Sequence, residues 1–247
     1  MNVLITDTGS VFGHALAMEY LNTGAQVFGI SKRPNDQLNK YVNYDHLKHD
    51  VEKIDDLDKK LRDFLSHVKI FDLVVLNADT IPVKQEIRNI TVNQIIDAMN
   101  INVLVNKIII DVLMDSTSEI YQVVAISTGA LASSARGWNA YAISKSALNT
   151  LMRLYARDFP QTHFSAIDPG MTDDANTRES FIPGNNKKYK VSGRIKGVQN
   201  KGNIPDPVYA ANYMIEAMGI VLQEESGAYR DVRDLFFSPQ LKEQISS

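Results

Sequence analysis

The chain has 247 residues, of which 44% are hydrophobic, with a formal net charge of −3 and no cysteine. This composition is that of an ordinary globular protein, and it excludes disulfide bonds, thiolate metal sites and a thiol nucleophile. The slightly acidic charge, without any aromatic-basic module, argues against nucleic-acid binding. The longest apolar runs, such as residues 108–110, are far shorter than the roughly 18 residues of a membrane span. We therefore expect a cytoplasmic protein that binds neither nucleic acid nor membrane.

Short apolar runs alternate along the chain with longer segments of helical period. The runs predict buried parallel strands at residues 3–6, 27–30, 73–76, 123–126 and 164–167, and a last strand at 226–232. The other segments predict helices at residues 12–22, 55–67, 93–114, 141–157 and 206–218. This alternation predicts an α/β fold: a doubly wound, mostly parallel, Rossmann-like sheet with helices on both faces. We expect a single domain over residues 1–247, because no repeat or linker divides the chain.

Residues 173–205 break this pattern. The segment is polar, contains glycines and carries several lysines and arginines, with no acidic residue after Glu179 until Asp206. Connections of this length within a compact domain are usually lids, binding loops or disordered segments. We expect a flexible substrate lid over residues 173–205, whose lysines belong to a solvated loop. Closure of this lid over an anionic substrate or the cofactor phosphates is the alternative.

Tyr141 and Lys145 are four residues apart on the helix expected at 141–157, so their side chains share one face. An ammonium group at that distance favours the phenolate and lowers the tyrosine pKa from its usual value of about 10. The pair would serve as a general acid and base for an oxygen that gains or loses a proton during hydride transfer. Tyr44 and Lys48 repeat the spacing in a short segment without supporting context, and we interpret that copy as a surface coincidence.

Polar and glycine-containing stretches follow the predicted strands. In open parallel sheets, ligands bind beyond the carboxyl ends of the strands, near the point where the strand order reverses. We therefore expect the binding site to gather the stretches at residues 7–13, 31–33, 77–79, 127–129 and 169–172.

Further markers stand in a fixed order along the chain. They are Thr6 with Gly13 after the first strand, His49-Asp50-Val51, Leu76-Asn77-Ala78, Asn102, Thr128, Tyr141 with Lys145, and Pro169-Gly170. This ordered set resembles the short-chain dehydrogenase/reductase family, in its single-domain branch, over nearly the whole chain. The runs at 126–130, 137–138 and 226–232 look like those of the sepiapterin reductase and benzil reductase group, whose members reduce diketones or side-chain ketones with NADPH.

The resemblance implies a catalytic set of Asn102, Thr128, Tyr141 and Lys145. In this set, Tyr141 protonates a carbonyl oxygen, while Lys145 lowers the tyrosine pKa and holds ribose hydroxyls. Thr128 donates a hydrogen bond to the substrate oxygen, and Asn102 keeps a water near Lys145 for proton relay. Neighbouring Ser127 is the donor instead if the strand ends one residue earlier.

The resemblance also implies a nicotinamide cofactor, whereas the histidines show no metal-ligand spacing, so no metal site is expected. Ser31 stands where NAD-binding members carry an acid, and Lys32 and Arg33 follow it. A hydroxyl and two cations suit a 2′-phosphate, so we expect NADP(H) in preference to NAD(H); a solvated basic turn is the alternative. The cofactor-binding residues that the resemblance implies are Thr6, Gly9, Phe12, Gly13, Ser31, Lys32, Arg33, Asp50, Val51, Asn77, Ala78, Tyr141, Lys145, Pro169, Gly170 and Thr172.

The glycine-rich turn departs from the family pattern. The three family glycines fall on Asp7, Val11 and Gly13, whereas a slipped register would use Gly9 and Gly13. Aspartate tolerates a left-handed backbone better than most residues, but β-branched valine does so badly. An ionised Asp7 would repel a pyrophosphate, and Asp79, where the family has glycine, adds a second acid. Either the turn has another shape and still binds the cofactor, or binding is weak or lost.

The leading hypothesis is an NADP(H)-dependent oxidoreductase that reduces a small ketone or diketone, or oxidises the corresponding alcohol. The alternative is a non-catalytic relative that uses the fold as a binding or sensor protein with a degenerate cofactor loop. The altered glycine pattern supports the alternative, and retention of all four catalytic positions opposes it. The helices expected at 93–114 and 141–157 correspond to those through which family members associate, so we expect a homodimer or homotetramer.

Overall fold

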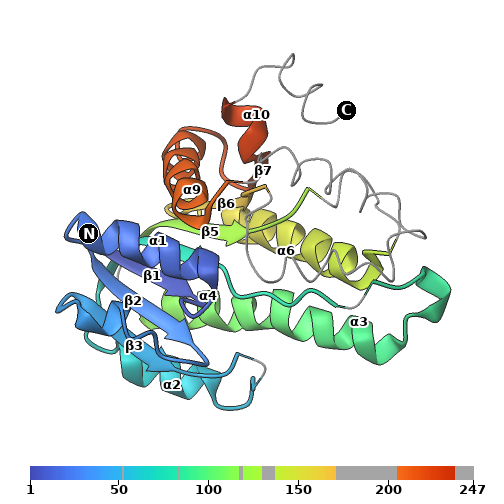
Figure 1. The fold of residues 1–247 in the computed structure, drawn as a ribbon, viewed down its shortest axis with the longest axis horizontal. Helices are drawn as coiled ribbons and strands as arrows, with labels where there is room; N and C mark the ends of the chain where they lie inside the picture. The colour runs from blue at the N-terminus through green and yellow to red at the C-terminus, as the bar shows by residue number, and fades with distance from the viewer. Residues whose placement is uncertain (52, 83, 117–118, 130–136, 171–204, 237–247) are drawn as a thin grey trace.

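The computed structural model describes residues 1–51, 53–82, 84–116, 119–129, 137–170 and 205–236 of the chain (Figure 1). Across these residues seven strands form one sheet in the order β3-β2-β1-β4-β5-β6-β7, and all neighbouring strands run parallel. The strands are β1 (Asn2–Thr6), β2 (Gln26–Ser31), β3 (Tyr44–Lys48), β4 (Ile70–Leu76), β5 (Glu119–Ile126), β6 (His163–Asp168) and β7 (Ala228–Asp231). The α-helices are α1 (Val11–Asn22), α2 (Leu57–Leu65), α3 (Val92–Met99), α4 (Val105–Ser116), α6 (Asn139–Asp158), α9 (Pro207–Val221) and α10 (Val232–Phe236). Two short 3₁₀ turns, η1 (Leu38–Lys40) and η2 (Ile87–Asn89), and a π-helical segment, η3 (Asn100–Leu104), complete the elements.

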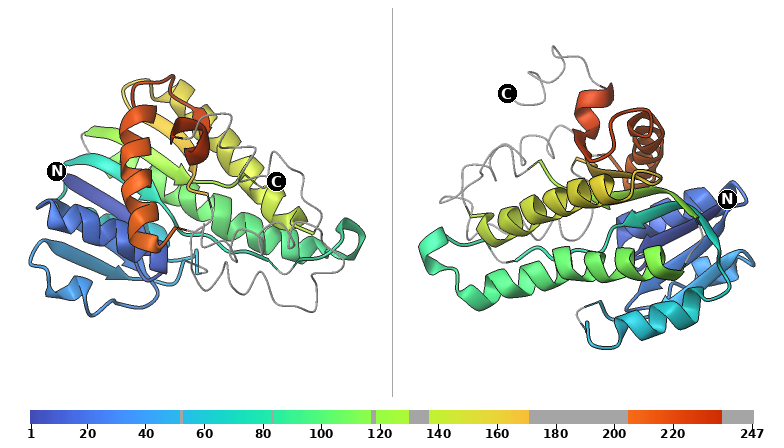
Figure 2. Two further views of the ribbon diagram at one scale, coloured as in Figure 1. Left: turned by 45° about the horizontal axis from the view of Figure 1, so that its top comes forward. Right: turned by 180° about the vertical axis from the view of Figure 1, so that it is seen from behind.

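Helices cover both faces of the sheet. Helices α1 and α9 lie on one face, and α2, α4 and α6 lie on the other (Figures 1 and 2). Successive strand residues point to opposite faces, so Val3 and Ile5 pack with α1 and α9, whereas Leu4 between them packs with α2 and α4. Both faces are therefore buried, which explains why the strands are continuous apolar runs and confirms the predicted doubly wound fold. In the described part of the chain, no helix has the length and apolar character that a membrane crossing needs.

The strand order reverses at β1, which lies between β2 and β4. The hydroxyl of Thr6, at the end of β1, accepts hydrogen bonds from the backbone N–H groups of Asn77 and Ala78, both at 2.8 Å. Thr6 is fully buried, so these bonds hold the ends of β1 and β4 together in a dry environment. This is the edge of the sheet at which a ligand is expected.

Two sequence-based expectations are wrong in detail. The segment that contains Tyr44 and Lys48 is strand β3, at the edge of the sheet, and Tyr44 is buried with its hydroxyl 2.9 Å from that of Thr8. Tyr44 is therefore not a surface residue, although Lys48 is exposed. The helix expected at 93–114 is interrupted by η3, because one turn of it is π-helical.

Candidate active site

Tyr141 and Lys145 lie on the first turns of α6, with their side chains buried at the carboxyl end of the sheet. The ammonium group of Lys145 is 1% exposed and donates a hydrogen bond to the carbonyl of Ile126, the last residue of β5, at 2.8 Å. The same ammonium lies 5.6 Å from the centre of the Tyr141 ring. A lysine is rarely buried unless its ammonium group is paired, so Lys145 is not a solvated surface residue.

Asp79 occupies the space between the two side chains. Its Oδ2 atom accepts a hydrogen bond from the Tyr141 hydroxyl at 2.9 Å and lies 3.1 Å from the Lys145 ammonium. Burial, followed by the negative charge of Asp79, raises the pKa of Tyr141 well above its ordinary value. The expectation that Lys145 lowers this pKa is therefore wrong for the structure described, because the lysine charge is already paired with a carboxylate.

Thr128 and Ser127 point to different partners. The hydroxyl of Thr128 donates a hydrogen bond to that of Tyr141, which opposes the rise in the tyrosine pKa. The hydroxyl of Ser127 instead donates to Oδ1 of Asn149 at 2.7 Å, and its backbone N–H continues the ladder with Ile167. Of the two candidate donors, Thr128 is the one that the structure brings to Tyr141.

Asn102 lies within η3 and is completely buried. Its side-chain Oδ1 accepts from the N–H of Thr80 at 2.7 Å, and its Nδ2 donates to the carbonyl of Thr80 at 3.1 Å. Nδ2 also donates to the hydroxyl of Ser144 at 2.9 Å, which in turn donates to the carbonyl of Tyr141. Asn102 thus joins the loop after β4 to the helix that carries Tyr141 and Lys145. Single π turns are frequent at functional sites, where they re-aim one side chain of a helix.

The turn between β1 and α1 keeps the shape of a glycine turn despite its substitutions. Asp7 has φ of +54°, the left-handed conformation, and Ser10 caps the helix by accepting from the N–H of Gly13. A Cβ atom on Gly13 would lie 2.2 Å from the Asp7 carbonyl oxygen, so only glycine fits there. Val11 is the first helical residue, is 45% exposed, and does not adopt a positive φ. The conformational objection to valine at this position therefore does not apply.

The substituted turn brings negative charge to the cleft. Burial and the charge of Asp79 raise the pKa of Asp7 to about 6, although a hydrogen bond with Ser10 opposes the rise. Asn77 stabilises the same turn, since its Nδ2 donates to the carbonyl of Thr6 at 3.2 Å and to the hydroxyl of Ser10 at 3.2 Å. The turn thus combines a helix N-terminus, which attracts anions, with a partly buried acid, which repels them.

Ser31, Lys32 and Arg33 lie next to the glycine turn. A Cβ atom on Gly9 would be 3.3 Å from the Arg33 carbonyl oxygen and 3.4 Å from Ser31 Cβ. The Ser31 hydroxyl donates to the Arg33 carbonyl at 2.7 Å and contacts Nε2 of His46 on β3 at 2.9 Å. Lys32 forms a 2.7 Å ion pair with Asp50, and its side chain remains 60% exposed. The basic residues expected for a 2′-phosphate therefore lie beside the turn expected for the pyrophosphate.

Sequence reasoning missed an ionic cluster beyond β6 and β7. Asp168, at the end of β6, is 4% exposed, and burial followed by the charge of Asp231 raises its pKa to about 6. The guanidinium group of Arg233 donates a hydrogen bond to the carboxylate of Asp231, and its Nη2 atom lies 3.4 Å from Oδ2 of Asp168. Gly129 donates its backbone N–H to Asp168. The negative charge of Asp168 also acts on Tyr141. The available signal was an acid directly after an apolar strand, at the edge where ligands bind.

The loop after β4 also forms the wall of the site. Gln85 donates its N–H to the carbonyl of Gly137, and Asn139 donates from Nδ2 to the carbonyl of Gln85 at 2.7 Å. Beside this contact the ring of Trp138 lies 5.6 Å from that of Tyr141, with the Lys84 ammonium 4.3 Å from the Trp138 ring. The ring of Tyr141 is therefore flanked by the ring of Trp138, which in turn carries the Lys84 ammonium.

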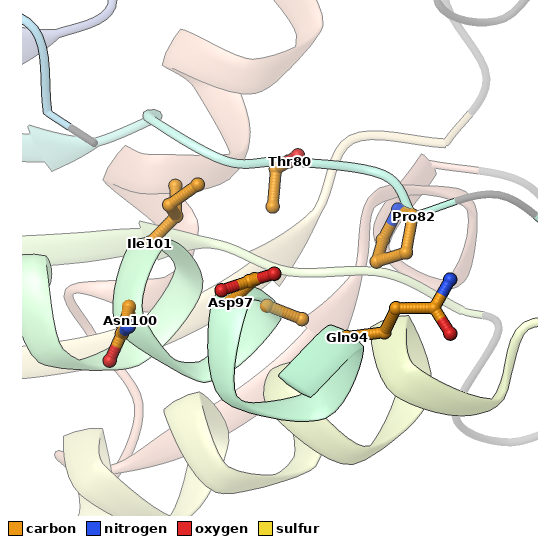
Figure 3. Close-up of a pocket in the computed structure, with 7 residues that line it drawn as sticks. Thr80, Pro82, Gln94, Asp97, Asn100 and Ile101 are labelled. Atoms are coloured by element: carbon orange, nitrogen blue, oxygen red, sulfur yellow. The ribbon is translucent and has the colours of Figure 1, made fainter. Parts of the chain in front are cut away.

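A cavity of about 470 Å³ lies on the other side of this loop, against α3 and η3 (Figure 3). Thr80 points from the loop toward the helix, where Asp97 and Ile101 face it, while Asn100 points away. The cavity contains none of the predicted catalytic residues. It is separate from the Tyr141 site, although the same loop borders both.

The remaining predicted cofactor residues have unequal access to a ligand. The side chain of Phe12 is buried in the core, and that of Val51 is partly buried against the opposite core. Gly170, which follows Pro169, has φ of +77° and donates its N–H to Oδ1 of Asp168. Thr172 lies outside the described residues, as does the segment 173–204 expected to form the lid.

Comparison with known proteins gives a consistent result. Residues 1–184 match the family model of the short chain dehydrogenases. A benzil reductase ((S)-benzoin forming) from Bacillus cereus is 25% identical over 225 residues, a match that covers 85% of this chain and 90% of that protein.

Solved structures are similar over nearly the entire chain. A short chain dehydrogenase/reductase from Saccharomyces cerevisiae superposes with a TM-score of 0.82 at 18% identity, covering 98% of both chains. A short chain dehydrogenase from Escherichia coli CFT073, complexed with NADPH, gives a TM-score of 0.74 at 18% identity and covers 94% of this chain and 96% of its own. At 18% identity these two likenesses concern the fold.

Proposed function

The chain belongs to the short chain dehydrogenase family, and we propose that it is an NADP(H)-dependent oxidoreductase that reduces a small ketone or diketone. Membership of this family confirms the resemblance seen in the sequence and makes the chain an oxidoreductase. The observation that carries the finer proposal is the meeting of Thr128, Tyr141 and Lys145 beside the end of β5. This arrangement supports an enzyme over a non-catalytic binding or sensor protein.

Members of this family bind a nicotinamide cofactor, and the residues at the β1–α1 turn fit one. The close approach of Gly13 to the Asp7 carbonyl keeps the turn tight, and the N-terminus of α1 offers backbone N–H groups to a phosphate. The carboxylates of Asp7 and Asp79 repel the negative charge of a phosphate, so we expect the cofactor to bind more weakly than it would to a turn with three glycines. When bound, the cofactor supplies a hydride to the substrate carbon.

The side chains of the site supply the proton and hold the substrate. Tyr141 gives its hydroxyl proton to the carbonyl oxygen of the substrate, and the hydroxyl of Thr128 donates a hydrogen bond to the same oxygen. Lys145 is fixed by its bond to the carbonyl of Ile126 and by its ion pair with Asp79, close to the Tyr141 ring. The net change is a ketone that gains a hydride at carbon and a proton at oxygen, which yields an alcohol.

The preference for NADP(H) rests on Ser31, Lys32 and Arg33. Ser31 and Arg33 lie against Gly9, and none of the three residues is an acid, whereas an acid at the end of β2 would favour the unphosphorylated ribose. Arg33 is exposed and offers a guanidinium group for bidentate contact with a phosphate.

The substrate proposal rests on the aromatic wall of the site and on the relative that reduces benzil. Trp138 lies beside Tyr141, where it would contact a flat substrate, and Lys84 lies over one face of its ring. An aromatic diketone such as benzil is therefore the first substrate to try.

The test is calorimetric titration with NADPH and NADH at matched salt, followed by assay of NADPH consumption with benzil. We expect tighter binding of NADPH, loss of that preference in Arg33→Ala, and turnover of benzil. Lys69→Ala removes an exposed cation beside the amino end of β4 and should change neither result. Failure of the folded protein to bind either nucleotide would overturn the proposal.

We further propose that copies of the chain form a homodimer or homotetramer in the cytoplasm. Helices α3 and α6 and the π-helical segment η3 present exposed apolar side chains, which a partner copy would cover.

A further inference from the structure

We propose that Asp79 is a positioning residue that holds the proton on Tyr141 and so widens the pH range over which the site can protonate a carbonyl substrate. The inference rests on the proposed function for its consequence, but its physical basis is the contact of one carboxylate oxygen with two catalytic candidates. It assigns a role to the acid that replaces the family's glycine after Asn77-Ala78.

The first support is geometric. Oδ2 of Asp79 accepts from the Tyr141 hydroxyl at 2.9 Å and pairs with the Lys145 ammonium at 3.1 Å, while the Asp79 side chain is 21% exposed. The adjacent residue, Thr80, is held at both its N–H and its carbonyl by Asn102. A loop anchored one residue away keeps the carboxylate in place, so the contact does not depend on a mobile side chain alone.

The second support is the balance of charges around Tyr141. Asp79 faces it from the loop after β4, Asp168 from the end of β6, Lys145 from its own helix and Thr128 from the loop after β5. The Lys145 charge is paired with Asp79, so the two together act on the tyrosine as a dipole rather than as a free cation. Ionising Tyr141 would place a second anion against the carboxylate. Burial and Asp79 accordingly raise the pKa of Tyr141.

The consequence concerns the pH range rather than the direction of the reaction. Reduction requires the phenol form of Tyr141, and it slows once the pH exceeds the tyrosine pKa. Asp79 cannot alter the equilibrium between ketone and alcohol, because a catalyst changes both rates together. What it does is move the alkaline fall in reduction to higher pH. Without Asp79, the ammonium of Lys145 would be free to stabilise the phenolate.

The test compares Asp79→Asn and Asp79→Gly with the parent in the cofactor-free protein. Ionisation is followed by the ultraviolet absorbance of phenolate, and subtraction of the same titration in Tyr141→Phe isolates Tyr141. In the parent we expect no ionisation of Tyr141 below about pH 10. In both variants we expect the Tyr141 transition to move at least one pH unit below that of the parent, which corresponds to about tenfold more phenolate at a fixed pH. Asparagine keeps the shape of the side chain and decides the question if the glycine variant does not fold.

The matched control is Asp97→Asn, which removes an exposed acid from α3 on the far side of the loop. It should leave the Tyr141 transition unchanged. A transition that does not move in folded Asp79→Asn, or moves no more than in Asp97→Asn, would overturn the inference.

The pH profile of kcat/KM for benzil reduction provides the second readout. The parent should stay flat up to about pH 10, while Asp79→Asn should fall within that range. A shifted phenolate transition in a protein that reduces no carbonyl compound would reject the proposed function and leave the effect of Asp79 on Tyr141 intact. A reductase whose variants show neither a spectral shift nor an alkaline fall would reject the role of Asp79 alone.

Discussion

Asn102 holds both backbone polar groups of Thr80 with one side-chain amide, at 2.7 Å and 3.1 Å. The two residues are far apart in the chain, and the contact joins the completely buried Asn102 of the π turn to the half-buried Thr80. Leaving a buried polar group without a hydrogen bond costs about 1–3 kcal/mol, so these two bonds hold the loop after β4 in place. The family's asparagine therefore has a structural task in this chain, while its role in a water relay stays a prediction.

Replacing Tyr141 with phenylalanine removes the proposed acid without creating a cavity. We expect benzil reduction to fall by about 10²–10⁴-fold, because general acid catalysis contributes that much, with NADPH affinity little changed. Tyr155→Phe is the control, since Tyr155 lies on the same helix but bonds Asp111 and stacks on Phe164. Activity that survives in Tyr141→Phe would contradict the mechanism.

Thr128 and Ser127 can be separated by substitutions that keep or remove the hydroxyl. Thr128→Val keeps the volume but loses the donor, and we expect kcat to fall by about 10²-fold, whereas Thr128→Ser should retain most activity. Ser127→Ala loses its bond to Asn149 and should cost about 1 kcal/mol of stability with little change in kcat. The reverse pattern would make Ser127 the donor.

Gly13→Ala should damage the glycine turn. Its new Cβ atom would lie 2.2 Å from the Asp7 carbonyl oxygen and 2.8 Å from Asn77 Nδ2, so the backbone must move. We expect a lower melting temperature and loss of NADPH binding. Gly219→Ala is the matched control, because a Cβ atom there meets nothing within 4 Å, and alanine should stabilise helix α9 by up to about 1 kcal/mol. Equal behaviour of the two variants would contradict the close packing at Gly13.

Asp7→Asn should change how stability depends on pH. The pKa of Asp7 is raised from 3.8 to about 6 in the folded protein, so the folded state holds the proton more tightly than the unfolded state. The stability contributed by this group is present at low pH and is lost as the pH rises from about 4 to about 6. The asparagine variant lacks that loss and should be more stable at pH 8 by up to about 3 kcal/mol.

Denaturant unfolding of Asp7→Asn and the parent at about pH 4 and about pH 8 checks this expectation. The two proteins should differ at the higher pH and converge at the lower one. Because asparagine also tolerates a positive φ, the variant keeps the turn and should bind NADPH more tightly at neutral pH. Weaker binding would show that the Asp7 carboxylate assists the cofactor rather than repelling it.

The exposed apolar side chains of the long helices predict self-association. Ile96 on α3 is 48% exposed, Leu154 on α6 is 51% exposed, and both would be covered by a partner copy. Ile96→Lys with Leu154→Lys should shift the protein to smaller species in analytical ultracentrifugation. Val42→Lys, at a fully exposed residue in the connection before β3, should not. A parent that sediments as a monomer would contradict the expected homo-oligomer.

The sequence was sufficient to predict the sheet wherever the strands are buried on both faces. Strand β3 was missed because an edge strand needs fewer apolar residues, and Tyr44–Lys48 alternates too weakly to register as a strand. The π turn was missed because one extra residue in a helix turn changes the backbone bonding without altering the local composition.

Spacing along the chain predicted that Tyr141 and Lys145 would meet, because both lie on one helix. It could not predict that Asp79 would lie between them, since the loop after β4 and helix α6 are far apart in the chain and meet only in the folded protein. The sign of the tyrosine pKa shift depended on that contact, so the expectation built from the pair alone had the wrong direction.

The bond from Lys145 to the carbonyl of Ile126 ties the chemistry to the sheet rather than to the surface. Helix α6 and strand β5 form the interior, whereas Lys84, Gln85 and Trp138 on the connections shape the approach to the tyrosine. Substitutions at Lys84, Gln85 or Trp138 leave in place both the bond from the ammonium group to the strand and the contacts of Asp79. This division makes the walls of the site the natural place to redesign selectivity, while the proton-handling centre is left untouched.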